Sequence, residues 1–362
     1  MLSNESKLKL FMESLGIYSP TGSEHELAEF IMELLTMNGF EARIDDVGNV
    51  IATRGGSGEP NLWLHAHMDT VPGFIEVRRE GNKIIGRGGA SDDKGPLMAM
   101  VFAFMESELP RGTLVLTAVV HEEGDSLGTR HLITGNHVHR PTGIIIGEPT
   151  GINKIVTKYR GGSTKLEVMV RTRGGGHASN PDLDSNSILI AMNVYKDLWD
   201  ALKAGVSYES ILVTPTVMNC GEAENMIPSN CRLVLDVRIP PGRSCRDIEN
   251  AINELGVKYG GSITINMKWC TEPVEVPINN LSARAVSRAI IKVLNERPTL
   301  ARKWGTSDMN ELARLTSNIV AYGPGGDGAF SHSLEEYILV DDFLRAVDIY
   351  KQAVFEFMSM YR

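Results

Sequence analysis

The first part of the chain alternates between short apolar runs and segments with helical spacing. A continuous apolar run is typical of a strand that is buried on both faces, as in a parallel sheet. We expect such strands around Val50 and at 62–64, 114–120 and 144–146, with helices between them at 95–108 and 127–134. Buried strands that alternate with helices predict an α/β fold, in which helices flank a mixed, mostly parallel sheet.

Two short motifs predict the starts of helices. Ser23 stands three positions before Glu26, and Ser333 stands three positions before Glu336. In a capping box, a serine and an acid at this spacing accept hydrogen bonds from each other's backbone N–H groups at a helix N-terminus. We therefore expect a helix to begin at each motif, and the first helix to end near Gly39.

The segment 161–272 has a different rhythm. It begins with "STKLEVMVRTR", which alternates like a strand, and "NSILIAMNVYKDLWDALKAG", which has the spacing of an amphipathic helix. Two strands, a helix and a last strand follow in "SILVTPTVMN", "NCRLVLDVRI", "SCRDIENAINELGVKYG" and "SITINMKW". The order β-α-β-β-α-β is that of a ferredoxin-like unit. We predict a small α+β domain at 161–272, inserted into a larger domain formed by 1–160 and 273–362.

Composition and charge argue against nucleic-acid binding and membrane insertion. The chain is 42% hydrophobic and 22% charged, as is usual for soluble globular proteins. Its net charge is -9 and no block rich in Lys or Arg stands out, so nucleic acid is not an expected partner. The longest apolar run, 97–105, is far shorter than the ~18 residues that a membrane span needs. The N-terminus has no apolar signal-peptide core, and we expect a cytoplasmic protein.

The cysteines suggest no metal or redox motif. No CxxC pair occurs, so neither a zinc ribbon nor a thioredoxin-like site is predicted. We expect buried, reduced thiols, with disulfides as the alternative if the source is a hyperthermophile. All four fall within the expected inserted domain, at Cys220, Cys231, Cys245 and Cys270.

Candidate metal ligands and acid–base residues recur directly after apolar strands or in glycine-rich turns. In open α/β sheets, functional groups gather at the carboxyl ends of the strands. One loop with a histidine and an acid is common by chance, but repeated placement at strand ends predicts a single site. The residues are His67 and Asp69, Asp92 and Asp93, Glu122 and Glu123, Glu148, and His332.

The mixture of residue types suits a pair of divalent ions. Imidazole and carboxylate ligands are typical of zinc or a similar borderline metal. The set exceeds what one tetrahedral site with an open position needs, and it fits two ions about 3.5–4 Å apart that share a bridging carboxylate. Of adjacent acids such as Glu122 and Glu123, one can hold a metal while the other takes a proton from water. Strand periodicity places His65, His67 and Asp69 on one face, without deciding which of them are ligands.

These residues, in this order, resemble the aminoacylase, carboxypeptidase and deacetylase family of co-catalytic zinc hydrolases, over essentially the whole chain. The resemblance implies two zinc ions per subunit, with cobalt as an alternative. It also implies a cis peptide after Asp92, a carboxylate at Asp69 that orients His67, and Glu122 as general base. His65 then becomes a packing or hydrogen-bonding residue. The implied ligands are His67, Asp92 and Glu148 for one ion, and Asp92, Glu123 and His332 for the other.

The same resemblance makes the inserted domain a lid through which the chain forms a homodimer. In the segment "RGGGHASNP", His177 would reach across the dimer and stabilise the oxyanion in the partner's active site. The segments "GEAENMIPSN" and "LDVRIPP" would supply Asn225 and Arg238 near the substrate. A guanidinium in that position suits a substrate carboxylate.

A narrower resemblance concerns the substrate. The stretches "GTSDMNELA", "AYGPG" and "SHSLEEYI" are similar to those of hydrolases that release lysine or ornithine from the C-terminal glutamate of an amino-group carrier protein, in lysine and arginine biosynthesis. The bond is a linear amide rather than a peptide bond. In "TKYRGGS", Tyr159 stands before Arg160, where succinyl-diaminopimelate desuccinylases carry paired arginines. The expected substrate-binding residues are Arg160, Asn225, Arg238, Thr306, Asp308 and Asn310, of which Asp308 and Asn310 would read the side-chain ammonium.

Two alternatives stay open. An N-acyl amino-acid deacylase of the acetylornithine or succinyl-diaminopimelate type, or a dipeptidase, would use the same chemistry on a small substrate. A non-catalytic binding protein on a hydrolase scaffold is the alternative from another class. The carrier protein is acidic, as is this chain, so a complex requires a local basic patch, for which the candidates are Arg160, Lys165, Arg171 and Arg173.

Overall fold

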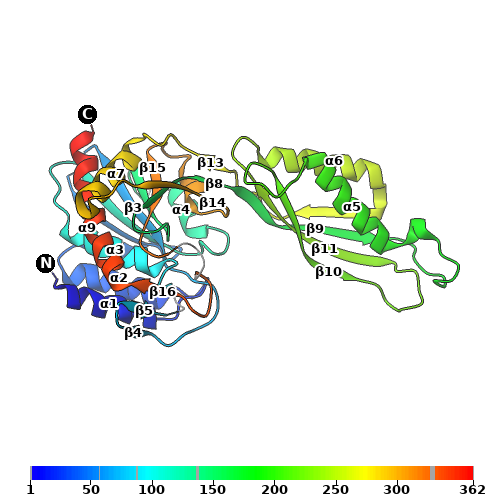
Figure 1. Ribbon diagram of the computed structural model, residues 1–362, viewed down its shortest axis with the longest axis horizontal. Helices are drawn as coiled ribbons and strands as arrows, with labels where there is room; N and C mark the ends of the chain where they lie inside the picture. The colour runs from blue at the N-terminus through cyan, green and yellow to red at the C-terminus, as the bar shows by residue number, and fades with distance from the viewer. Residues whose placement is uncertain (1, 57, 87–88, 136–137, 327–330, 362) are drawn as a thin grey trace. The chain divides into compact units, whose positions relative to one another are not determined.

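The computed structural model describes residues 2–361 except 57, 87–88, 136–137 and 327–330, and gives only the backbone for 163–165. The chain divides into two compact units (Figure 1). Unit 1 comprises Met1–Thr157, Val276–Arg302 and Ser307–Arg362, and unit 2 comprises Lys158–Glu275 and Lys303–Thr306. The sequence pattern did not predict that Lys303–Thr306 groups with unit 2. The reason is Trp304, whose ring lies 5.3 Å from both the guanidinium of Arg160 and the ring of Tyr208.

A nine-stranded mixed sheet forms the framework of the larger unit. Its central strands β6, β3, β7 and β15 are parallel to one another, and antiparallel strands complete both sides. The strand order is β1-β2-β6-β3-β7-β15-β8-β13, with β14 beside β8. The strands are β1 Glu41–Ile44, β2 Val50–Gly55, β3 Asn61–His67, β6 Thr113–Val119, β7 Gly143–Gly147, β8 Lys154–Tyr159, β13 Val274–Glu275, β14 Thr299–Lys303 and β15 Ile319–Tyr322. This confirms the predicted α/β fold with a parallel centre.

The apolar runs in the sequence are continuous because the central strands are covered on both faces. Every residue of β3, β6, β7 and β15 is buried, as expected for strands that are covered on both faces. Helices α3, α7 and α9 pack against one another and against these strands. The helices of this unit are α1 Asn4–Gly16, α2 His25–Met37, α3 Lys94–Glu106, α4 Leu127–Thr134, α7 Leu281–Leu294, α8 Asp308–Leu312 and α9 Val340–Met360.

None of the helices in the described ranges has an apolar stretch that would cross a bilayer. A small sheet contains β4 Arg78–Glu80, β5 Lys83–Ile85 and β16 Tyr337–Leu339.

Neither motif forms the predicted capping box, although α2 does begin at the first motif and ends at Met37, near Gly39 as predicted. Helix α2 has Glu24 rather than Ser23 as its N-cap, without a side-chain capping bond. Helix α9 begins at Val340, beyond the second motif. The carboxylates of Glu24 and Glu336 accept hydrogen bonds from backbone N–H groups of other loops instead. Hydrogen bonds between distant segments thus override the local helix-start signal.

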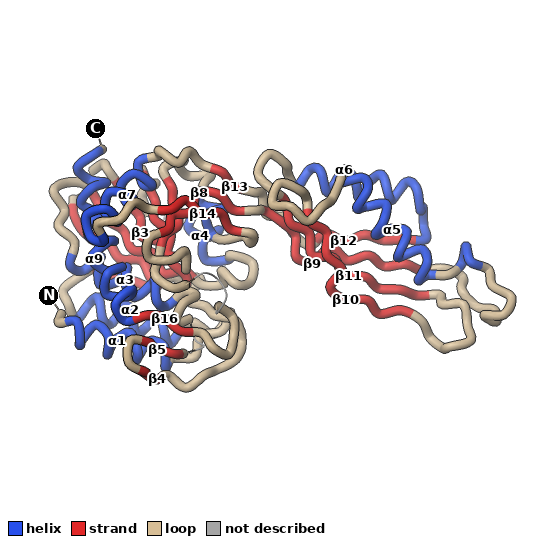
Figure 2. The backbone as a smooth tube through the Cα atoms, viewed as in Figure 1, coloured by secondary structure: helices blue, strands red, loops and turns tan. Residues whose placement is uncertain are grey.

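Unit 2 has the predicted β-α-β-β-α-β order. Its four-stranded sheet, β10-β11-β9-β12, is antiparallel throughout. Helices α5 and α6 contact each other and cover one face of this sheet (Figure 2). The elements are β9 Gly161–Arg171, α5 Ser187–Leu202, β10 Leu212–Cys220, β11 Asn230–Ile239, α6 Cys245–Tyr259 and β12 Ile263–Met267. The unit has its own hydrophobic core between sheet and helices.

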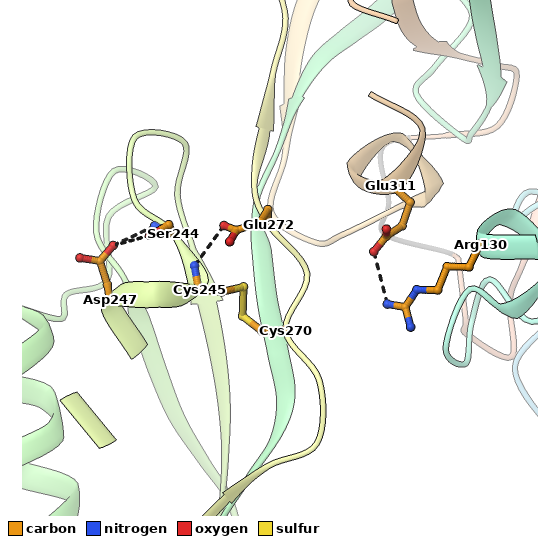
Figure 3. Close-up of a disulfide and its surroundings, with 7 residues drawn as sticks. All are labelled: Arg130, Ser244, Cys245, Asp247, Cys270, Glu272 and Glu311. Carbon is orange, nitrogen blue, oxygen red and sulfur yellow. Dashed lines mark hydrogen bonds and ion pairs between the residues drawn. A yellow bond between two sulfur atoms is a disulfide. The ribbon is translucent and has the colours of Figure 1, made fainter. Parts of the chain in front are cut away.

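The four cysteines form two disulfides, so the expectation of reduced thiols was wrong and the alternative holds. Cys220 and Cys231 are direct partners on neighbouring strands β10 and β11, with Cα atoms 4.1 Å apart. Cys245 at the start of α6 is bonded to Cys270, and the carboxylate of Glu272 accepts a hydrogen bond from the Cys245 N–H (Figure 3). Strand register and loop paths decide which cysteines meet, and spacing in the sequence does not show them.

Candidate metal centre

Most of the ligand candidates lie just past the carboxyl ends of the central strands. His67 is the last residue of β3, Glu122 and Glu123 follow β6, and Glu148 follows β7. Strand β3 is parallel to both β6 and β7, so the three carboxyl ends open at the same edge of the sheet. Asp92 reaches this edge from the loop that precedes α3.

Asp92 faces two imidazoles at once. Its Oδ1 lies 3.3 Å from Nε2 of His67, and its Oδ2 lies 3.4 Å from Nε2 of His332. Nε2 of His332 is also 2.6 Å from a carboxylate oxygen of Glu123. His332 has a φ of 64°, in the left-handed region that few non-glycine residues adopt. The two oxygens of Asp92 therefore point to two separate ligand groups, as a bridging carboxylate requires.

Asp69 connects the ligand histidine to the acid pair. Its carboxylate accepts hydrogen bonds from the backbone N–H of Glu122 at 2.9 Å and of Glu123 at 3.0 Å. Nδ1 of His67 lies 2.9 Å from the Asp69 carbonyl oxygen and 3.4 Å from its carboxylate. Burial alone would raise the pKa of Asp69, but the hydrogen bonds from His67 and Thr21 lower it. The proton on Nδ1 is thereby fixed toward Asp69, which leaves Nε2 of His67 free for a metal.

The peptide between Asp92 and Asp93 is cis, as predicted. The Asp93 carboxylate is fully buried and accepts a hydrogen bond from the His67 N–H at 3.2 Å. Gly89 has a φ of +85°, and a Cβ there would meet the backbone nitrogen of Asp93 at 2.9 Å. Only glycine fits at position 89. This turn and the hydrogen bond between Asp93 and the His67 N–H together set the path of the loop that carries Asp92.

Glu148 is the one predicted ligand outside the three compact groups of ligand atoms formed by described residues. Its side chain is nevertheless buried, with 8% exposed. Burial raises the pKa of Asp93, and the negative charges of Glu148 and Asp92 raise it further. The role of Glu148 as a ligand stays a prediction.

The charges in this cluster fit a divalent metal pair. Burial raises the pKa of Glu122 well above its usual value, and the charges of Asp308, Glu148 and Glu123 add to this effect, while His67 opposes it. A buried cluster in which carboxylates outnumber imidazoles is unfavourable unless a cation neutralises it. Imidazole nitrogen and carboxylate oxygen are also the donor set of zinc and related ions. The residues that could hold such ions are His67, Asp92, Asp93, Glu122, Glu123 and His332.

Zinc binding is expected to release protons and to weaken as the pH falls from about 8 to about 6. Hydrogen bonds with Asp92 and Glu123 raise the pKa of His332 to about 10. Burial alone would lower the pKa of His67, but hydrogen bonds with Asp69 and Asp92 outweigh burial and raise it. A metal binds only neutral imidazole, so it has to displace these protons. Calorimetric zinc titrations in buffers of different ionisation enthalpy count the protons, and a pH-independent affinity would contradict the prediction.

Sequence reasoning missed the residues that brace the ligand loops. Thr21 donates a hydrogen bond to the Asp69 carboxylate at 2.8 Å. One carboxylate oxygen of Glu24 accepts hydrogen bonds from the N–H of Gly22 at 3.0 Å and of His121 at 3.2 Å, just before the acid pair. No local pattern separates a glutamate that braces a distant loop from one that caps its own helix.

His65 and Asp308 form a buried pair in unit 1. Nδ1 of His65 lies 2.8 Å from the Thr117 hydroxyl, and Nε2 lies 3.0 Å from Oδ2 of Asp308. His65 is thus a hydrogen-bonding residue, as predicted. Oδ1 of Asp308 is buried and makes no hydrogen bond with the described part of the chain. Asp308 is buried, and its charge acts on Glu122, neither of which the sequence predicted.

Helix α8 fixes the predicted substrate residues Asp308 and Asn310. Oδ1 of Asn310 accepts a hydrogen bond from the Ser307 N–H at 2.9 Å in a capping box. Glu311 of the same helix is paired with Arg130 of α4 at 3.3 Å (Figure 3). These contacts connect α8 to the preceding loop and to α4, while a substrate role for Asn310 stays a prediction. Thr306, in unit 2, is exposed.

The remaining predicted residues lie in unit 2. Arg160 is fully buried, stacked on the rings of Tyr208 and Trp304, with hydrogen bonds to the carbonyl oxygens of Ser210 and Arg238. It therefore cannot contribute to an exposed basic patch, and that part of the prediction was wrong. The guanidinium of Arg238 makes two hydrogen bonds with Asp236, at 2.7 and 2.9 Å.

The other candidates for the basic patch differ in their surroundings. Arg171 is exposed. The guanidinium of Arg173 is paired with Asp182 at 2.5 Å. The side chain of Lys165 lies outside the described residues. Among the candidates whose side chains are described, the patch therefore keeps Arg171, together with Arg173 if it leaves Asp182.

His177 and Asn225 lie close together. The backbone of His177 pairs with that of Met226, and the Ala178 N–H donates to the Asn225 carbonyl oxygen at 2.9 Å. Both side chains are exposed. The Ser179 N–H donates to Nδ1 of His177 at 3.2 Å, so the neutral ring carries its proton on Nε2. That nitrogen is the one available to donate to an oxyanion.

The chain is similar in sequence to a known protein family and to two named archaeal proteins. Residues 63–356 match the model of peptidase family M20/M25/M40. The chain is 47% identical, over 96% of both chains, to a Pyrobaculum aerophilum protein provisionally named LysW-lysine/LysW-ornithine hydrolase. It is 33% identical to the LysW-lysine/LysW-ornithine hydrolase of Sulfurisphaera tokodaii, over 98% of this chain and 96% of that one.

The solved structures agree with the fold. An M20 family metallo-carboxypeptidase from Sulfolobus solfataricus matches with a TM-score of 0.80 at 19% identity, covering 98% of this chain and 99% of that one. An aminopeptidase from Bacillus cereus matches with a TM-score of 0.79 at 19% identity and 99% coverage of each chain. These similarities confirm the resemblance and the architecture that the sequence predicted. The chain is a member of peptidase family M20/M25/M40.

Proposed function

We propose that this protein is a metal-dependent amidohydrolase that releases lysine or ornithine from the C-terminal glutamate of an acidic amino-group carrier protein. The observation that carries the proposal is the convergence of ligand loops on Asp92, beside Glu122, in a chain whose near-full-length relatives bear that substrate in their names. Its place would be in lysine and arginine biosynthesis, in the cytoplasm.

The two ions are proposed to be zinc, with cobalt as the alternative. Bound at His67, Asp92, Glu148, Glu123 and His332, they would polarise the amide carbonyl and lower the pKa of water. The protein itself would hold the metal ligands at fixed positions and place an acid–base group beside them.

Glu122 is the proposed general base. Burial and nearby carboxylates raise its pKa, so it can take a proton from water and return it to the leaving amine. The Asp69 carboxylate holds the Glu122 N–H and orients His67. His177, through a homodimer formed by unit 2, would donate Nε2–H to the oxyanion of the partner's substrate. Asn225, Arg238 and Thr306 are proposed to contact the substrate. Arg160, which was expected to do the same, is fully buried and donates a hydrogen bond to the Arg238 carbonyl oxygen, so we propose that it supports Arg238 instead.

Asp308 is proposed to bind the side-chain ammonium of the released amino acid. Its Oδ2 is fixed by His65, and its Oδ1, which has no hydrogen bond from any described residue, is suited to a cation. Asp308→Asn keeps the hydrogen bond with His65 but removes the charge. The variant is expected to bind lysine at least about tenfold more weakly, since a hydrogen bond to a charged group contributes about 1.5–3 kcal/mol.

Norleucine, which keeps the α-ammonium but lacks the side-chain ammonium of lysine, is the matched control for Asp308→Asn. Its binding should be unchanged, and so should the metal content. Calorimetric titration of both amino acids into wild type and variant measures the difference. Equal loss for lysine and norleucine, or no loss for lysine, would contradict the assignment.

A panel of substrates tests the function as a whole. The carrier-protein adducts of lysine and ornithine, acetylornithine, succinyl-diaminopimelate and dipeptides are assayed side by side with metal analysis. We expect kcat/KM to be highest for a carrier adduct. A preference for a small free substrate would establish the deacylase or dipeptidase alternative, and binding of the adduct without turnover by the metal-loaded protein would establish a non-catalytic binding protein.

A further inference from the structure

Glu336 connects the loop of the last metal-ligand candidate to the loop of the bridging one. It follows His332 by four residues and is only 2% exposed. One oxygen of its carboxylate accepts hydrogen bonds from the Ser91 N–H at 2.8 Å and from the Asp92 N–H at 3.0 Å. The carboxylate therefore holds the backbone of Asp92 itself, and not merely a neighbouring part of the loop.

The backbone around Glu336 holds the other end of the same loop. Its carbonyl oxygen accepts a hydrogen bond from the Gly86 N–H at 3.2 Å. The next residue, Tyr337, begins β16 and pairs with Ile85 of β5. Gly86 and Asp92 are thus both fastened to Glu336, one by its main chain and one by its side chain.

Burying a carboxylate is costly unless hydrogen bonds compensate it. The second helix-start motif, to which Glu336 belongs, does not begin a helix, so the carboxylate serves no capping function. Removing it would leave two interior N–H groups at Ser91 and Asp92 without this acceptor. The bridging carboxylate would then lose the restraint that keeps its oxygens opposite His67 and His332.

We propose that Glu336 is a positioning residue that sets the metal affinity of the site by fixing the backbone of Asp92. It acts through Asp92 and touches neither metal nor substrate. Partners of this kind, one shell outside the ligands, typically change metal affinity by about 10- to 100-fold. The proposal concerns the metal site alone and holds whichever amide the protein hydrolyses.

Metal affinity separates this role from a general effect on folding. Glu336→Ala removes the acceptor, whereas Glu336→Gln keeps an oxygen that can accept both N–H bonds. The neighbouring Glu335 is exposed, so Glu335→Ala is the matched control. Zinc affinity of each metal-stripped protein is measured by competition with a chelator, the cobalt-substituted proteins are compared by visible absorption, and the Tm of each metal-free protein reports its folding.

We expect Glu336→Ala to bind at least one zinc ion about 10- to 100-fold more weakly and to change the cobalt spectrum. Glu336→Gln should restore affinity to within about threefold of wild type, and Glu335→Ala should equal wild type. Wild-type affinity in Glu336→Ala, or equal losses in the Ala and Gln variants, would overturn the proposal. If Glu336→Ala does not fold, Glu336→Asp takes its place, because its side chain is one methylene shorter and its oxygen lies farther from the two N–H groups. Wild-type zinc affinity in Glu336→Asp would then overturn the proposal.

Discussion

Glu122→Gln is expected to lower kcat by about 100- to 10,000-fold while two metal ions stay bound. The amide has the shape of the carboxylate but cannot take a proton from water. The hydrogen bond from the Glu122 backbone to Asp69 does not involve the side chain, so the acid-pair loop should keep its position. Steady-state kinetics on the best substrate of the panel, together with metal analysis by atomic emission, measures both halves of the prediction.

Asp125→Asn is the control for Glu122→Gln. Asp125 lies in the same loop, but its side chain is 55% exposed and faces His121 rather than the cluster. It should retain wild-type kcat. A Glu122→Gln enzyme that keeps more than about a tenth of the wild-type kcat would exclude Glu122 as the base.

Asp92→Asn is expected to affect both metal positions together. The two carboxylate oxygens lie opposite His67 and His332, and an amide offers only one good donor atom to a cation. Loss of an outer-shell partner can lower metal affinity by about 100-fold, and we expect the zinc affinity of Asp92→Asn to fall further than that. Metal content after dialysis and kcat should fall together.

The exposed Asp348→Asn is the control for Asp92→Asn, since Asp348 lies on α9 with 62% of its side chain exposed. The variant should match wild type in metal content and kcat. If Asp92→Asn retained two ions of wild-type affinity, Asp92 would not be the bridge. If it lost one ion only, Asp92 would be an ordinary ligand of that ion.

The places of the ligand candidates in the fold could be predicted because each strand end carries its own local signal. An apolar run followed by His67, by Glu122 and Glu123, or by Glu148 shows both that a strand is buried and where it stops. Parallel pairing then brings these ends to one edge whatever lies between them in the sequence. The fold class and the order of elements in unit 2 followed from the same periodicities.

The supporting contacts could not be predicted because they join segments that no pattern relates. Glu336 matched a helix-start motif, yet its carboxylate holds Asp92. Arg160 is covered by Trp304, which follows β14 and lies well beyond the inserted segment in the sequence. Cys245 meets Cys270 only because of the path that the chain takes after β12. Each of these contacts depends on tertiary geometry, which a residue's neighbours in the sequence do not encode.

The carboxylate of Asp69 has a consequence for how this enzyme can vary. It holds the ring of His67 on one side and the backbone of Glu122 and Glu123 on the other. A substitution there would disturb the predicted ligand and the proposed base in the same step, so a second mutation at either residue would repair only one of the two contacts. Changes of substrate preference are therefore expected at positions outside this junction, where one substitution alters one contact at a time.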